Sequence, residues 1–163
     1  MLELIYTVMA VYYILLNKTV GEAQVFMNAQ KITFPSTVKI AIRQKVKKPV
    51  LLEETLAGLK CIKTSRTRTR GKTKTYTETV YDELKPVESN RQLRAGENLE
   101  CTVDISAPEN IPPSTQADGS GYPRIDWFLC VKIRIASSPD YTNDFHILVE
   151  NPSFSSNDEE MNA

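Results

Sequence analysis

Few residues of this chain could act as catalysts, and their sequence contexts favour structural roles. Histidine, the side chain that most readily exchanges protons near neutral pH, occurs once, at His146. It stands between Phe145 and Ile147 in an alternating segment, which predicts an outward-facing strand histidine rather than a catalytic base. The sequence also lacks the glycine-rich phosphate loops, the nucleophile elbow and the H-E-x-x-H zinc motif. We therefore expect no catalytic residue, no cofactor, no metal ion and no small-molecule substrate.

The three cysteines favour neither a disulfide framework nor a zinc site. Cys61, Cys101 and Cys130 are an odd number, and no C-x-x-C pair is present. A reducing compartment suits them best. Cys101 alternates inward with apolar neighbours, and we expect the same of Cys61, so both thiols should behave as small apolar side chains. Cys130 alternates outward, and we expect it to be packed under a neighbouring loop rather than to be reactive.

The segment from Lys60 to Thr79 (KCIKTSRTRTRGKTKTYTET) has the most unusual composition of the chain. Basic residues and threonines alternate in it, and Arg70-Gly71 offers a turn that would pair this arm with residues 72–79. A two-stranded basic ribbon is the predicted result. Its candidate contact residues for anionic lipid or an acidic partner are Lys60, Lys63, Arg66, Arg68, Arg70, Lys72 and Lys74.

Two interpretations of this ribbon remain open. Its bases could bind an anionic membrane surface or an acidic or phosphorylated protein segment. Alternatively, it is a solvated hairpin whose charges and threonines protect an exposed edge from aggregation. Nucleic acid is not expected as a partner, because only Tyr76 could stack on bases and the whole chain is neutral, with 20 basic and 20 acidic residues.

Charge is distributed unevenly along the chain. Residues 18–74 carry 14 bases and 3 acids, whereas residues 75–163 carry 6 bases and 16 acids. Early and late strands interleave in an antiparallel sandwich, so this asymmetry predicts charge pairs between neighbouring strands. A ligand-binding patch is the alternative.

The segments that contain the histidine, the cysteines and the basic residues are predicted to be short strands. Segments 37–46, 97–105, 124–135 and 143–149 alternate apolar and polar residues clearly, and segments 25–34 and 50–64 do so more weakly. No segment after residue 20 has the period of an amphipathic helix, and turn residues recur between the strands. These observations predict an all-β, two-sheet antiparallel sandwich over residues 22–150. We expect residues 111–122 to form an exposed loop and residues 151–163 a disordered acidic tail.

Residues 1–17 form an apolar segment of borderline length for a membrane helix. The run MLELIYTVMAVYYILL has 16 residues, whereas a spanning helix needs roughly 20. A marginal or clipped membrane helix and a buried strand both remain open; its tyrosines and the flanking Lys18 favour the helix. No basic residue precedes the run, which argues against a signal peptide. If it spans, the bases that follow it place the sandwich on the cytoplasmic side.

The order of these pieces resembles the arrestin-like sandwich, an immunoglobulin-like fold. The matching pieces are VKIAIRQKV, the strand LAGLKC with its small central residue, RQLRAGENLECTVDI, PENIPPS and the long strand IDWFLCVKI. The chain also looks like uncharacterised bacterial membrane proteins in which a transmembrane segment precedes such a domain. The resemblance covers about residues 37–150, and only one sandwich fits. It implies a non-catalytic adaptor that contacts proteins or lipids, and it assigns no functional residues.

These observations lead to three hypotheses of function. The first is a membrane-associated binding or adaptor module that uses the basic ribbon as its contact surface. The second is a soluble structural or assembly protein in which the N-terminal segment is a strand of a sheet. The third is an enzyme of unfamiliar type, which would need a deep pocket holding His146 or Cys130 beside a carboxylate.

Overall fold

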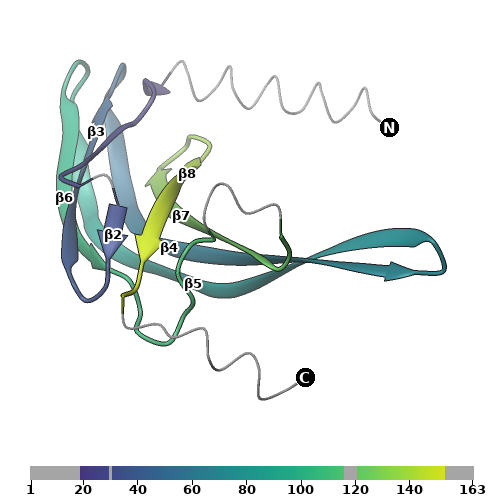
Figure 1. Ribbon diagram of the computed structural model, residues 1–163. Helices are drawn as coiled ribbons and strands as arrows, with labels where there is room; N and C mark the ends of the chain where they lie inside the picture. Colours follow the sequence, from purple (N-terminus) through teal and green to yellow (C-terminus); the bar gives the residue numbers. More distant parts are fainter. Residues whose placement is uncertain (1–18, 30, 116–120, 153–163) are drawn as a thin grey trace, which may run out of the picture.

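Eight strands form two sheets in the computed structural model, which describes residues 19–29, 31–115 and 121–152 (Figure 1). The strands are β1 (Gln24–Met27), β2 (Lys31–Thr33), β3 (Thr37–Lys45), β4 (Val50–Thr69), β5 (Lys72–Leu93), β6 (Asn98–Ser106), β7 (Arg124–Ile135) and β8 (Tyr141–Glu150). One sheet has the order β1-β3-β6 and the other β2-β8-β7-β4-β5. The predicted all-β, two-sheet architecture is confirmed.

Both predicted terminal segments fall largely outside this description. The apolar segment 1–17 and the part of the acidic tail beyond Pro152 lie outside the described residues. Within the described ranges, there is no helix whose length and apolarity would allow it to cross a bilayer.

The four clearly alternating segments are the strands β3, β6, β7 and β8, and their apolar residues point between the sheets. In β7 the side chains of Trp127, Leu129 and Ile133 are at most 2 % exposed. Polar residues can share this face: Gln44 of β3 is also buried, and its amide donates a hydrogen bond of 2.8 Å to the carbonyl of Gly21. The inward face of β3 therefore includes Gln44, where a polar residue interrupts the apolar pattern of the sequence.

The segment 25–34 alternates weakly because it supplies strands to both sheets. Residues of β1 pair with β3 in the three-stranded sheet, whereas β2, only a few residues later, pairs with β8 in the other sheet. The β2–β8 pairing is parallel, so the expectation of a wholly antiparallel sandwich is wrong at this edge. A strand that changes sheets must reverse which side faces the core, and this reversal breaks the two-residue period.

The long strands β4 and β5 also depart from simple alternation, in their case because of bulges. Glu53 is an extra residue on β4 opposite β7, and the β4–β5 ladder shifts register beside Val87 and Val80 of β5. Strand β5 continues past these bulges to Leu93, well beyond the predicted arm 72–79. It forms an edge of its sheet, and its bulges together with Pro86 are features that discourage another strand from pairing there.

Charge pairs do join early and late strands. Arg43 of β3 lies 2.8 Å from Glu100 of β6, and Lys31 of β2 lies 2.8 Å from Glu150 of β8. The predicted pairing between the basic and acidic halves is confirmed at these positions. Because the side chains are about half exposed, each pair contributes only a small amount to stability.

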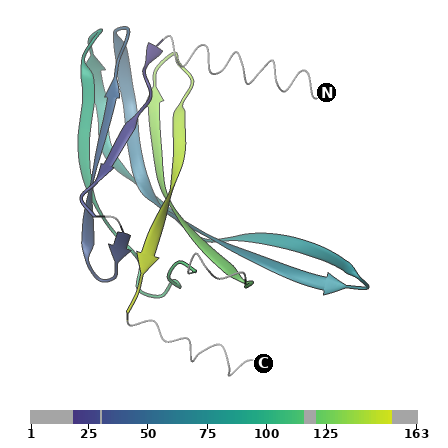
Figure 2. The same ribbon diagram turned by 45° about the horizontal axis from the view of Figure 1, so that its top comes forward.

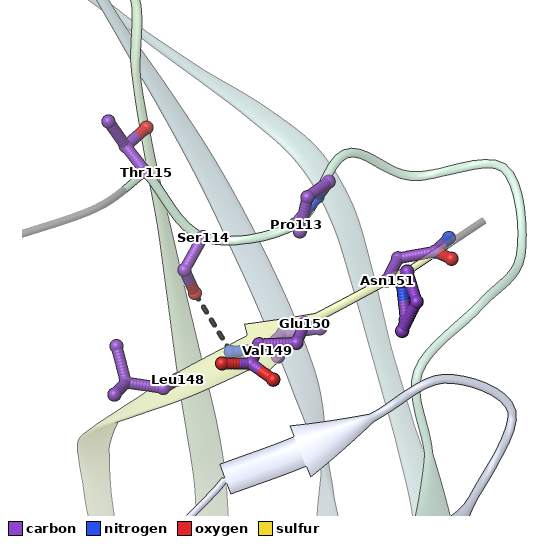
Figure 3. Close-up of a pocket in the computed structure, with 8 residues that line it drawn as sticks. Pro113, Ser114, Thr115, Leu148, Val149, Glu150 and Asn151 are labelled. Atoms are coloured by element: carbon purple, nitrogen blue, oxygen red, sulfur yellow. Dashed lines mark hydrogen bonds between the residues drawn. The ribbon is translucent and has the colours of Figure 1, made fainter. Parts of the chain in front are cut away.

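Residues 112–115 lie between β7 and β8 where these two strands are no longer paired, and they form hydrogen bonds to both. The Oγ of Ser114 accepts a hydrogen bond of 2.9 Å from the amide of Val149 in β8 (Figure 3). The amide of Ser114 in turn donates to the carbonyl of Val149. Thr115 makes the equivalent pair of bonds with Ile125 of β7. The indole of Trp127 donates to the carbonyl of Pro112 at 3.0 Å. The PPS and W-x-L motifs thus belong to one structural unit.

Candidate functional site

The tip of the β4–β5 hairpin has the turn that its sequence predicts. Arg70 and Gly71 have φ values of 53° and 77°, and Thr69 pairs with Lys72 across the turn. Two consecutive residues with positive φ form the tight turn whose twist matches that of the flanking strands, and glycine adopts this conformation without steric cost. The predicted pairing of the two arms is confirmed. The threonines that fill both arms are β-branched residues and favour strands.

This hairpin extends beyond the rest of the sheet. The β4–β7 ladder ends at Thr64 and Arg124, whereas β4 and β5 remain paired up to the turn. At about 3.3 Å per residue, the six residues from Thr64 to Arg70 carry the turn roughly 20 Å past the end of this ladder. Figures 1 and 2 both show the hairpin pointing away from the sandwich. We call residues 65–76 the projecting ribbon.

The register of the ladder divides the bases between two faces. Directly opposed residues share a face, and Arg66 and Arg68 oppose Thr75 and Thr73. We call this the arginine face. The other face, which we call the lysine face, has Lys72, Lys74 and Tyr76 on β5, opposed by Thr69, Thr67 and Ser65 on β4. The structure thus gathers these bases at the end of the hairpin but divides them between its two faces.

The two remaining candidate residues lie nearer the sandwich and oppose acidic residues. Lys60 pairs in register with Asp82, and Lys63 with Glu78. The projecting ribbon, in contrast, contains five bases and no acid. Within the described residues, none of its bases lies within 4 Å of a carboxylate oxygen. A net charge of +5 is therefore concentrated at the end of the molecule.

Arg66, on the arginine face, contacts an aromatic residue that lies outside the ribbon. The guanidinium carbon of Arg66 lies 4.2 Å from the ring centre of Tyr122, a cation–π arrangement. Tyr122 belongs to the chain that leads into β7 and was expected only as part of an exposed loop. Its proximity to Arg66 depends on the pairing of β4 with β7, so no local pattern in the sequence could have indicated it.

The lysine face is hollowed near the turn. Thr69, Arg70, Lys72, Lys74 and Tyr76 line a hollow of about 310 Å³. Tyr76 is 54 % exposed. The hollow therefore combines three cationic side chains, a hydroxyl and an aromatic ring. Cationic donors of this kind attract phosphate or carboxylate groups.

His146 faces outward, as predicted. Its Nε2 lies 3.1 Å from Oδ1 of Asp126, whose carboxylate also accepts a bond from Nε of Arg124. The ring of Phe128 meets the His146 ring edge-on at 5.5 Å. The imidazole is about half exposed on the outer face of the five-stranded sheet. The carboxylate neighbour that an acid–base role would need is present, but it lies on an open strand surface.

Cys61 and Cys130 are buried, and Cys101 is partly buried against the core. Burial raises the pKa of Cys61 and of Cys101 to about 11. The pKa of Cys130 is raised to about 12, mainly by burial and secondly by the hydrogen bond to Asp144. Cys61 lies in the core as expected; Cys130, on the outer face, is 7 % exposed, with Gly58 and Asp144 beside it in the ladders. Low thiolate content makes all three poor nucleophiles.

Comparisons with known proteins inform the fold. No protein-family model matches the sequence, and no curated protein matches it significantly. Among solved structures, the chain is similar to Spo0M, a sporulation control protein from Bacillus subtilis, with a TM-score of 0.61 and 11 % identity over 81 % of this chain and 49 % of that chain. The chain thus spans about half the length of this neighbour. At this identity the likeness shows the fold alone, an arrestin-like β-sandwich.

Proposed function

We propose that the chain is a non-catalytic, membrane-associated binding module whose contact surface is the projecting ribbon. The observation that carries this proposal is the set of five bases without an acid in residues 65–76, held beyond the sandwich by the β4–β5 ladder. Bases on such a projection can approach a flat surface without interference from acidic residues of the same molecule. In this proposal the module works by binding alone, as an adaptor.

An anionic bilayer suits this arrangement better than a single small ligand does. Each Lys or Arg held close to an anionic membrane contributes about 1 kcal/mol of binding free energy, and the attraction decays within about 10 Å at 0.1 M salt. An apolar N-terminal segment in the membrane would tether the chain to the bilayer from the other end of β4, because Val20 bridges to Val46, shortly before β4 begins at Val50. The bases that follow this segment would then keep the sandwich on the cytoplasmic side.

The test is co-flotation of the full chain with vesicles, either of neutral phosphatidylcholine or with 30 % phosphatidylserine, from 50 to 400 mM salt. Replacing Arg68, Arg70 and Lys72 with glutamine should weaken binding to anionic vesicles on the order of 100-fold at low salt, at about 1 kcal/mol per charge. The matched control replaces three exposed lysines away from the ribbon with glutamine: Lys39 and Lys45 of β3, and Lys48 of the β3–β4 connection.

The outcomes separate the hypotheses. A much larger loss for the ribbon variant than for the control supports the proposal. Equal losses, or binding that does not depend on anionic lipid, would contradict it, since net charge or the N-terminal segment would then explain the binding. If the chain floats with neither vesicle and is a detergent-free monomer, the soluble structural protein replaces the membrane module. Salt-sensitive binding to an acidic peptide without vesicle binding would make the partner a protein.

A further inference from the structure

The projecting ribbon has two chemically different faces, and only the lysine face has an aromatic residue that belongs to the ribbon itself. On the lysine face, Tyr76 is 54 % exposed and stands beside Lys74. Tyrosine rings are enriched at the headgroup level of bilayers, where the ring lies in an apolar layer and the hydroxyl in water. Lysine side chains extend their apolar stems in the same layer while the ammonium group reaches the phosphates.

The hollow on the lysine face adds a place for a headgroup. Arg70, Lys72 and Lys74 line it together with Thr69 and Tyr76. Since Arg70 is in the turn, this hollow lies at the part of the ribbon farthest from the sandwich. Three cationic side chains are therefore available to the phosphate or carboxylate groups of a lipid that meets this face.

The arginine face differs in both respects. Its aromatic neighbour is Tyr122, which lies outside the ribbon and is 41 % exposed, and the guanidinium of Arg66 already stacks on this ring at 4.2 Å. The residues opposite Arg66 and Arg68 are Thr75 and Thr73, which are not aromatic. Docking this face on a bilayer would require Arg66 to exchange its contact with Tyr122 for lipid.

From these differences we infer that the ribbon docks on anionic bilayers through its lysine face, with Tyr76 at the headgroup level and the arginine face turned away. This inference rests on the proposed function and specifies its orientation. It assigns the membrane contact to Arg70, Lys72, Lys74 and Tyr76. Arg66 and Arg68 then act at longer range, where salt screens their attraction more strongly.

Charge-matched pairs of substitutions in the full chain test the orientation. Lys72→Gln with Lys74→Gln, and Arg66→Gln with Arg68→Gln, each remove two charges from the same ribbon. On vesicles with 30 % phosphatidylserine at 0.1 M salt, the lysine-face pair should bind about 30-fold more weakly, corresponding to about 1 kcal/mol per base. The arginine-face pair should lose clearly less, about 5-fold or under, because its charges lie farther from the surface.

A second measurement reports insertion directly. Tyr76→Trp and Tyr122→Trp are compared for fluorescence quenching by brominated phospholipids, with the buried Trp127 giving the same background in both. We expect quenching of the Tyr76→Trp variant alone. Quenching of Tyr122→Trp instead, or an equal loss of binding for both charge pairs, would overturn the orientation while leaving docking by the ribbon intact. If neither pair weakens binding, the proposed function fails as well.

Discussion

Replacing Gly58 with alanine should destabilise the protein strongly, although the change adds only one methyl group. Gly58 lies in β4, between Leu84 of β5 and Cys130 of β7 in the ladders. An alanine Cβ at this position would overlap the carbonyl oxygen of Glu83 and would lie 2.7 Å from its carbonyl carbon and 2.9 Å from Cα of Leu84. These are backbone atoms, so the clash cannot be relieved by rotating a side chain.

The cost follows from this geometry. Overpacking a well-filled site typically costs 1–3 kcal/mol, and displacing a paired strand places Gly58→Ala at about 3 kcal/mol. For a domain of this size, that corresponds to a fall in melting temperature of roughly 6–12 °C. Because β5 carries one arm of the projecting ribbon, this displacement should also loosen the base of the hairpin.

Thermal and urea unfolding followed by circular dichroism measure the effect, with Gly21→Ala as the matched control. A Cβ at Gly21 would meet Lys45 at 3.6 Å or more, which is ordinary contact, so this variant should stay within about 0.5 kcal/mol of the parent protein. If Gly58→Ala were as stable as Gly21→Ala, the close approach of β5 to β4 would be refuted.

Two further predictions concern the core and the thiols. Trp127→Phe removes the bond to the Pro112 carbonyl and should cost about 1–3 kcal/mol in urea unfolding; an unchanged midpoint would show that this bond is not needed to hold residues 112–115. The raised thiol pKa values mean that, above pH 9, the unfolded chain releases protons that the folded chain retains, so stability should fall as pH rises from 9 towards 11. Cys130→Ala should make this fall shallower, by up to about 1.4 kcal/mol per pH unit, and parallel profiles for the two proteins would argue against a protonated Cys130 thiol.

The sequence determined those features that depend on neighbouring residues. The clear alternation in 124–135 and 37–46 predicted strands and their inward faces, because side chains on a strand alternate sides with a period of two. Arg70-Gly71 predicted a tight turn between threonine-rich arms, because a glycine in this position tolerates positive φ. The basic composition of the hairpin was equally plain, since it required only counting charges.

Features set by contacts between distant segments were decided by the tertiary structure alone. The weak pattern in 25–34 did not reveal that β1 and β2 join different sheets, and the bulges of β5 hid a strand that continues to Leu93. The projection of the ribbon depends on where β7 stops pairing with β4, about 60 residues after Thr64 along the chain. The division into lysine and arginine faces depends on the β4–β5 register, and the Arg66–Tyr122 contact on the β4–β7 ladder. Strand order and register minimise the free energy of the whole core, so the residues of one segment alone do not specify them.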